Sequence, residues 1–339
     1  MMNNKIYEKI LNFIKENYKQ FLIVFILGII INFPLDYSIY ISGGTINVND
    51  RIELDNEYKS SGSFNLAYVT ELRATTFTYL LSYIIPFWEV IPLEEYQAST
   101  IETMEDVSIR SKLYLDRSKE DAIKLAYEKA SKNFTTKNTE FNIVYINEIV
   151  DADLKIGDVI LEINNKKLFD LNQYKELVEK TNVGEYINLK VRRNKKEFET
   201  KIKVNYINES KLTGISILEL SNYETTPEII LSFKDSESGP SGGLMLALAI
   251  YDKLIAEDLT RGKKIVGTGT IDEFGNVGEI DGVKYKLKGA IKEKADIFIA
   301  PSGNNYNECK RIIKEENYNI KLIEAKTFEQ VLNDLNSLN

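Results

Sequence analysis

The stretch DSESGPSGGLMLALAIYDKL, residues 235–254, runs from a Gly-Pro-Ser-Gly-Gly turn into a segment that is apolar on nearly every side. A helix with this pattern is buried, so the turn is predicted to place Ser241 at or near the amino end of a core helix. Gly239, Gly242 and Gly243 allow another backbone to approach closely, as a bound peptide must. The unpaired N–H groups and positive dipole end of such a helix favour an oxyanion. A serine before a helix is most often an N-cap, so Ser241 is either a structural cap or a nucleophile.

Histidine is absent from all 339 residues. Its absence excludes a Ser-His-Asp triad, a Cys-His pair and every imidazole proton shuttle. The general base of any hydrolase built on this chain must therefore be a carboxylate, a tyrosine or a lysine with a lowered pKa. The single cysteine, Cys309, excludes an intrachain disulfide, and the four ligands of a structural zinc site are lacking. We expect no metal and no cofactor.

The overall charge and the absence of a nucleotide-binding motif exclude two classes of binding partner. A net charge of −8 argues against a nucleic acid, whose phosphates need a basic face. The chain has no Gly-x-x-x-x-Gly-Lys-Ser/Thr loop, so we expect no nucleotide and no ATP-driven motor.

Three lysines, Lys284, Lys286 and Lys288, cluster within GTGTIDEFGNVGEIDGVKYKLKGA, residues 267–290, at the start of a predicted helix. A lysine cluster is normally a solvated surface. A lysine acts as a general base only where burial disfavours its ammonium form and lowers its pKa toward neutrality. The residues alone leave both interpretations open.

The amino-terminal segment combines basic residues with an apolar run. Residues 1–20 carry a net charge of +2, and residues 21–31 are apolar without a break. A membrane span needs roughly 20 mostly apolar residues, and the alternatives are a cleaved signal peptide and a buried core helix. No small-x-small cleavage site follows closely, so we expect a cytoplasmic tail at 1–20 and an uncleaved transmembrane anchor at 21–42. The chain would then be a single-pass protein of the cell membrane with its catalytic part on the extracellular side.

After residue 42 the sequence predicts a strand, a second apolar run and a helix. SFNLAYVTEL, residues 63–72, alternates like a strand, and residues 116–132 are predicted to form a helix with Ser118 as a plausible cap. Between them, residues 75–92 form a second apolar run that two prolines break. We interpret this run as an amphipathic excursion that packs on the domain or touches the bilayer surface.

The order of predicted strands and one helix in residues 137–207 indicates a separate module. Within them, LKIGDVILEINNKKLFDLNQYKELV, residues 154–178, resembles a PDZ domain of the bacterial protease-associated type. The resemblance implies a module that binds extended segments by adding a strand to an open sheet edge.

The carboxy-terminal residues 208–339 are predicted to be α+β. GPSGG at 239–243, followed by TGTID and GNVGEIDGVKYK, resembles the proteolytic domain of Lon-type proteases. Matched residue by residue, the resemblance implies that Ser241 is the nucleophile and Lys286 the base. Lys284 matches the preceding, non-catalytic lysine.

Further positions follow from the same match. Thr268 corresponds to the threonine that holds the base lysine, and the backbone around Gly239 and Ser241 would hold the oxyanion. Asp281 stands where the family pattern has the first glycine of a Gly-Gly pair, which adds a carboxylate near the site.

Taken together, these segments resemble the membrane-anchored Lon-like PDZ proteases of bacteria. The resemblance implies an α+β Lon-type proteolytic domain with an inserted PDZ-like domain, preceded by one amino-terminal transmembrane helix. Residues 43–136 would form the first part of the peptidase domain, with an irregular aromatic segment that includes the apolar run at 75–92.

The resulting expectation is an ATP-independent serine endopeptidase with a Ser-Lys dyad. It would cleave exported or membrane-proximal peptides and unfolded segments, which the PDZ-like module helps to select. A homo-oligomer is among the partners considered. One alternative is a non-catalytic membrane-anchored PDZ scaffold with a degenerate peptidase domain. Another, a signal peptidase, would place its serine soon after the anchor, whereas Ser241 lies far along the chain.

Overall fold

The computed structural model describes residues 2–207 and 209–338. They divide into two compact units, the first comprising Met1–Ile41 and Thr70–Leu93 and the second Ser42–Val69 and Glu94–Asn339. Strands β1 (Pro34–Asn47) and β3 (Ser63–Thr75) each contribute residues to both units.

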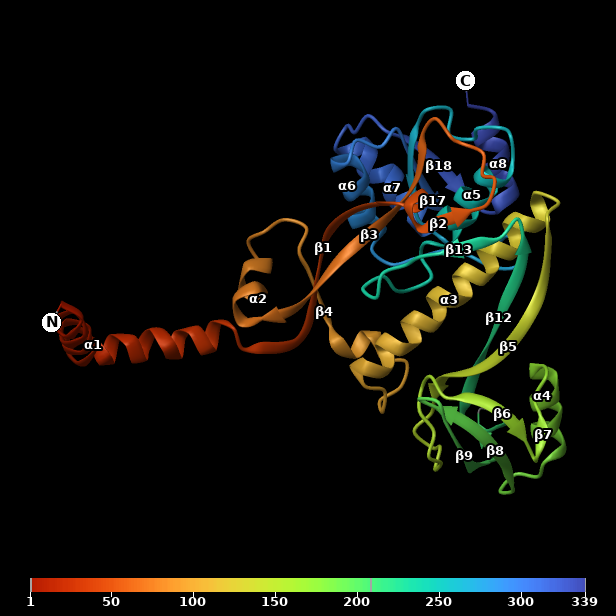
Figure 1. Ribbon diagram of the computed structural model, residues 1–339, viewed down its shortest axis with the longest axis horizontal. Helices are drawn as coiled ribbons and strands as arrows, with labels where there is room; N and C mark the ends of the chain where they lie inside the picture. The colour runs from red at the N-terminus through yellow and green to blue at the C-terminus, as the bar shows by residue number, and fades with distance from the viewer. Residues whose placement is uncertain (1, 208, 339) are drawn as a thin grey trace. The chain divides into compact units, whose positions relative to one another are not determined.

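The first unit contains helix α1 (Met2–Ile31), helix α2 (Thr76–Ser82) and strand β4 (Glu89–Pro92), with parts of β1 and β3. β4 pairs antiparallel with β1. Helix α2 begins at a capping box in which Thr75 and Thr78 each accept a hydrogen bond from the other's backbone. The apolar run predicted as an amphipathic excursion is therefore a short capped helix, a turn and a strand (Figure 1).

The predicted transmembrane anchor, residues 21–42, is not confirmed. Helix α1 ends at Ile31 and strand β1 begins at Pro34, so the later residues of the predicted span are extended. Pro34 contributes to this change, because the residue before a proline is biased away from helical conformation. Across the part of the chain that the structure describes, no helix combines the length and apolar character that a membrane crossing needs.

The second unit is built on a sheet with the strand order β18-β17-β14-β3-β1. β14 (Lys264–Gly267), β17 (Ile297–Pro301), β18 (Lys321–Ala325) and β3 are mutually parallel. Alternate residues face opposite sides, so Ile265 joins one core cluster and Val266 the other. The sheet is covered on both faces, as parallel strands require, and the broad mixture of helices and strands agrees with the prediction.

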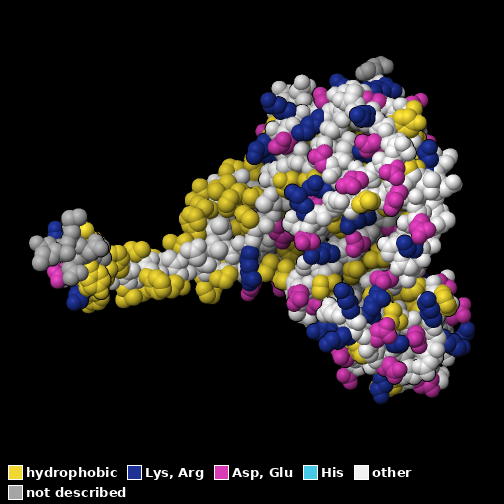
Figure 2. Space-filling model, viewed as in Figure 1, with side chains coloured by type: hydrophobic (Ala, Val, Ile, Leu, Met, Phe, Trp, Pro, Cys, Tyr) yellow, Lys and Arg dark blue, Asp and Glu magenta, His cyan; other side chains and the backbone are white. Residues whose placement is uncertain are grey.

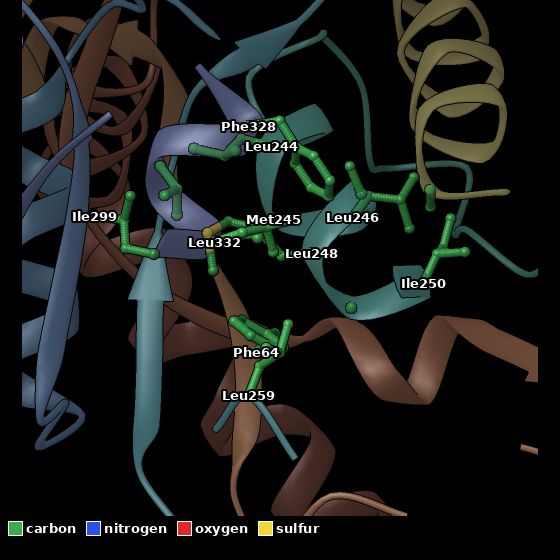
Figure 3. Packing of buried hydrophobic residues seen from close by; sticks show 14 of the residues in the cluster. Phe64, Leu244, Met245, Leu246, Leu248, Ile250, Leu259, Ile299, Phe328 and Leu332 are labelled. Atoms are coloured by element: carbon green, nitrogen blue, oxygen red, sulfur yellow. The ribbon is translucent and has the colours of Figure 1, made fainter. Parts of the chain in front are cut away.

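Helix α5 (Gly243–Leu254) lies at the centre of the larger core cluster and is buried along almost its whole length. Figure 3 shows its side chains Met245 and Leu248 among residues of the sheet and of α8 (Phe328–Asn336). The other face of the sheet is covered by α6 (Val283–Lys292) and α7 (Asn304–Glu315). The prediction of a buried helix after the Gly-Pro-Ser-Gly-Gly turn is confirmed.

Short elements complete this part of the second unit. They are η1 (Val48–Arg51), β2 (Ile52–Leu54), η2 (Leu93–Tyr96), β13 (Ile229–Leu231), β15 (Thr270–Ile271) and β16 (Val277–Gly278). β13 pairs with β2, and β15 pairs with β16.

Helix α3 (Met104–Lys129) begins twelve residues before the predicted helix at 116–132. Its N-cap is Thr103, which forms a capping box with Asp106. Ser118 was predicted as the cap and is instead a buried residue in the middle of the helix. The prediction failed because a complete capping box upstream outcompetes a lone serine as the start of a helix.

A second sheet contains the strands of the PDZ-like segment in the order β12-β5-β6-β8-β9. Its elements are β5 (Asn133–Ile146), β6 (Val159–Ile163), β7 (Lys166–Lys167), α4 (Leu171–Lys180), β8 (Tyr186–Arg193), β9 (Lys196–Lys203) and β12 (Ile215–Thr226). The hairpin of β10 (Asn205–Ile207) and β11 (Ser210–Leu212) leads into β12. β12 lies beyond the predicted range 137–207, yet it pairs with β5 from Ile215 to Thr226 (Figure 1).

Candidate active site

Ser241 lies in the turn immediately before α5, and its side chain is half-buried. The N-cap of α5 is Gly242, and no side chain caps the helix. Among the described residues, the Ser241 hydroxyl has no hydrogen-bond partner. The serine is therefore not consumed in capping the helix, and its hydroxyl is available for chemistry.

Helix α3 holds the turn from one side. The Ser118 hydroxyl donates a hydrogen bond of 3.1 Å to the carbonyl oxygen of Pro240. The Gly239 amide donates to the carbonyl oxygen of Ser111 at 3.0 Å. Gly239 adopts a φ of 83°, which favours glycine because a Cβ would strain this left-handed backbone. In this conformation the Gly239 amide, predicted to lie in the oxyanion region, is engaged with α3.

The segment after β14 holds the same turn from the other side. The Thr268 hydroxyl donates to the carbonyl oxygen of Ser241 at 3.0 Å, and the Gly269 amide donates to the same oxygen at 2.8 Å. The Leu244 amide in turn donates to the carbonyl oxygen of Gly269 at 3.1 Å. Thr268 thus ties the carboxyl end of a central strand to the backbone of Ser241.

Lys286 reaches this point from the first turns of α6. It is only 5% exposed, and its Nζ donates to the Thr268 hydroxyl at 3.2 Å. Burial lowers the pKa of Lys286 to about 8, and the nearby negative charge of Asp281 opposes that decrease. A substantial fraction of Lys286 is therefore neutral near pH 8, which is the form that accepts a proton.

The neighbouring lysines are in different environments. Lys284 is half-buried and its ammonium lies over the Tyr285 ring, 5.0 Å from the ring centroid. Lys288 is also half-buried, and burial lowers its pKa while the charge of Glu316 opposes this. Of the three clustered lysines, Lys286 alone is buried and hydrogen-bonded to Thr268.

The start of α6 explains how Lys286 is aimed inward. Its N-cap, Gly282, has a φ of 68° in the left-handed region, which glycine adopts without strain. Val283 and Leu287 pack into the sheet cluster, and Lys286 shares their side of the helix because neighbours three apart lie on one face. Asp281 is exposed, so the departure from the family glycine leaves the carboxylate in solvent.

Three of the predicted site residues thus come together: Lys286 bonds to Thr268, and Thr268 bonds to the backbone of Ser241. Ser118 and the carbonyl of Ser111 also contact the turn that carries Ser241, and the sequence did not assign them to the site. Both lie on α3, more than a hundred residues earlier in the chain, and no local motif signals such a contact.

Comparison with protein families finds two matches. Residues 135–204 match the PDZ domain, and residues 234–337 match the Lon protease (S16) C-terminal proteolytic domain. No curated protein matches the chain.

Solved structures similar to this chain include two from Listeria. The PDZ domain of the SdrC-like protein from Listeria monocytogenes has 18% sequence identity and a TM-score of 0.21, covering 23% of this chain and 86% of that one. The second domain of a Listeria protein solved in solution has 22% identity and a TM-score of 0.21, covering 24% of this chain and 83% of that one. The two family matches identify the domains: this chain contains a PDZ domain and a Lon protease (S16) C-terminal proteolytic domain, a combination that matches a Lon-like PDZ protease.

Proposed function

We propose that the chain is an ATP-independent serine endopeptidase in which Ser241 is the nucleophile and Lys286 the general base. The observation that carries the proposal is the buried amine of Lys286, with a pKa of about 8, linked through Thr268 to the backbone of Ser241. With no histidine in the chain, a neutral lysine is the base that supports acyl transfer here.

In the proposed reaction, Lys286 takes the proton of the Ser241 hydroxyl as the oxygen attacks the peptide carbonyl. The protonated lysine then gives its proton to the leaving amine, and an acyl-enzyme remains. Water attacks the ester, Lys286 again accepts a proton, and the carboxylic acid leaves as Ser241 is restored. Thr268 orients the lysine amine throughout.

The oxyanion donors in this proposal are the backbone amides of Ser241 and Gly242. Among the described hydrogen bonds none uses either amide, and both lie at the amino end of α5. A helix amino end favours a developing negative charge. The Gly239 amide joins them only if its bond to the Ser111 carbonyl opens.

The PDZ domain is proposed to align substrates. Strand β12 lies at one edge of its sheet and, among the described strands, pairs with β5 alone. Side chains of α3 already bond the Glu219 carbonyl and the Ser221 amide, so the part of the edge proposed for a peptide is Ile215–Leu218. An extended peptide adds to such an edge through main-chain hydrogen bonds. Substrates are then exported peptides, disordered tails or unfolded segments near the membrane.

We also propose that the chain is a single-pass protein of the cell membrane with its peptidase outside the cytoplasm. The net charge of +2 in residues 1–20 supports this orientation. The apolar side chains of α1 from Phe21 onward are exposed in the structure, and a lipid environment would cover them.

A single comparison tests the peptidase. Ser241→Ala is expected to lower the cleavage rate of an unfolded protein by at least about 10³-fold, because it removes the nucleophile. Ser236→Ala, at an exposed position of the same loop, is the matched control and should keep the wild-type rate. Cleavage at the wild-type rate by Ser241→Ala would refute the mechanism. The absence of any cleavage by either protein would favour the alternative function, a non-catalytic PDZ scaffold.

A further inference from the structure

The first unit exposes two apolar segments that contain no charged residue, 21–35 and 74–88. In the first, Val24 and Phe25 are each 66% exposed, and in the second Ile84 is 77% exposed. Figure 2 shows the hydrophobic side chains gathered over α1 and α2. Exposure on this scale is unusual for a water-facing surface and indicates a partner.

The two segments meet at one point of the first unit. The Thr76 amide, at the start of α2, donates a hydrogen bond of 3.0 Å to the carbonyl oxygen of Phe33, two residues after the end of α1. The ring centroids of Tyr37 and Tyr79 lie 5.3 Å apart just beyond this bond. Segment 74–88 therefore lies beside the carboxyl end of the apolar part of α1.

Charged residues lie on both sides of the apolar block that segments 21–35 and 74–88 form together. Lys15 and Lys19 are exposed on α1 before the apolar run. On the strands that follow, Arg73 and Asp36 form an exposed ion pair of 3.6 Å. An uncharged block between charged borders, with Tyr79, Tyr83 and Trp88 in its second segment, matches the layering of a bilayer and its interface.

The distribution of exposure distinguishes lipid from a protein partner. From Phe21 to Leu27 every side chain of α1 is at least 46% exposed, so the apolar surface surrounds the helix. A protein groove covers one face of a helix and leaves a polar face to water, whereas lipid covers all faces alike.

We propose that segment 74–88 is a second membrane contact, which lies in the headgroup–acyl boundary next to the point where α1 leaves the bilayer. The first unit is then held at the membrane by two adjacent segments rather than by α1 alone. The apolar run of α1 is short, and the aromatic and aliphatic side chains of α2 and of the turn after it add further apolar surface in contact with the membrane. This inference does not depend on peptidase activity.

The single tryptophan of the chain, Trp88, reports this contact directly. The full chain, carrying Ser241→Ala to prevent self-cleavage, is reconstituted into vesicles of zwitterionic and anionic phospholipids with or without bromine on the acyl chains. We expect brominated lipid to quench Trp88 emission and acrylamide in the water to quench it weakly. Emission that is indifferent to bromination and strongly quenched by acrylamide overturns the proposal.

Two variants sharpen the test. Leu80→Asp with Ile84→Asp places charges on exposed positions of segment 74–88 and should abolish most of the lipid quenching. Tyr206→Asp, at a site in the second unit whose exposure lies between those of Leu80 and Ile84, should leave the quenching unchanged. If a second copy of the chain covers Trp88 instead, its emission will change with protein dilution and not with bromination, which also overturns the proposal.

Discussion

Two opposing influences set the charge of Lys286. Burial disfavours the ammonium and lowers the pKa of Lys286 to about 8, whereas the carboxylate of Asp281 favours the ammonium. A glycine at position 281, as in the family pattern, would leave burial unopposed. In the proposed mechanism, the residue that departs from the pattern adjusts the pH at which Lys286 becomes neutral and able to accept a proton.

The pH profile tests this balance. Activity is expected to rise with pH, about tenfold per unit, until it levels off near the pKa of about 8, because the neutral lysine is the active form. Asp281→Asn removes the charge that stabilises the ammonium, so the rising limb should shift to lower pH. Glu316→Gln, whose charge acts on Lys288, should leave the limb in place. A shift in the opposite direction would contradict the role given to Asp281.

Among the elements, α3 connects the proteolytic part of the second unit with its PDZ sheet. Through Ser118 it bonds the nucleophile turn, and through two neighbouring residues it bonds strand β12 of the PDZ sheet. Arg117 donates to the carbonyl oxygen of Glu219 at 3.3 Å, and Glu120 accepts from the Ser221 amide at 2.9 Å. One turn of one helix therefore contacts both strand β12, next to the proposed substrate-binding part of its edge, and the turn that carries Ser241.

Removing the Ser118 hydroxyl tests this helix. Ser118→Ala leaves the Pro240 carbonyl without its donor, which should lower the free energy of unfolding by about 1 kcal/mol. Because the turn carries Ser241, we expect kcat to fall roughly fivefold with little change in KM. Ser108→Ala, exposed on the same helix, is the control. A loss of stability with unchanged kcat would show that the bond supports the fold and not the site.

For the whole molecule, the ribbon of β5 and β12 joins the PDZ domain to the peptidase. The strands pair from Ile215 opposite Ile146 to Thr226 opposite Asn133. The buried core of the PDZ domain lies between Phe141 and Val204, separate from the cluster around α5. The two domains therefore have independent cores, and the PDZ core is removable without opening the other.

A shortened chain tests the role of the PDZ domain. Thr139 and Ser221 are opposite each other in the ribbon, so an Asn-Gly turn joining them replaces residues 140–220 and keeps the ribbon base. Hydrolysis of a short peptide should stay within about threefold of wild type, whereas KM for an unfolded protein should rise by at least about tenfold, because the second binding site is gone. An unchanged choice of cleavage sites in the protein substrate would show that the PDZ domain does not select them.

The sequence by itself determined the two domain types, the buried helix after Gly-Pro-Ser-Gly-Gly and the pairing of Ser241 with Lys286 as candidates. The buried helix follows from apolar periodicity and from glycines at a tight turn, which neighbouring residues specify. The domain types and the choice of Ser241 and Lys286 come from the resemblance to known families, because the residues alone left both roles open.

The tertiary structure decided what depends on contacts between distant residues. Burial of Lys286 and the freedom of the Ser241 hydroxyl arise from the packing of α6, β14 and α5. The contact of Ser118 with the turn that carries Ser241 crosses 122 positions, and strand β12 joins a sheet whose other members precede it. The pKa of a lysine depends on the solvent excluded around it, and that exclusion exists only once the chain has folded.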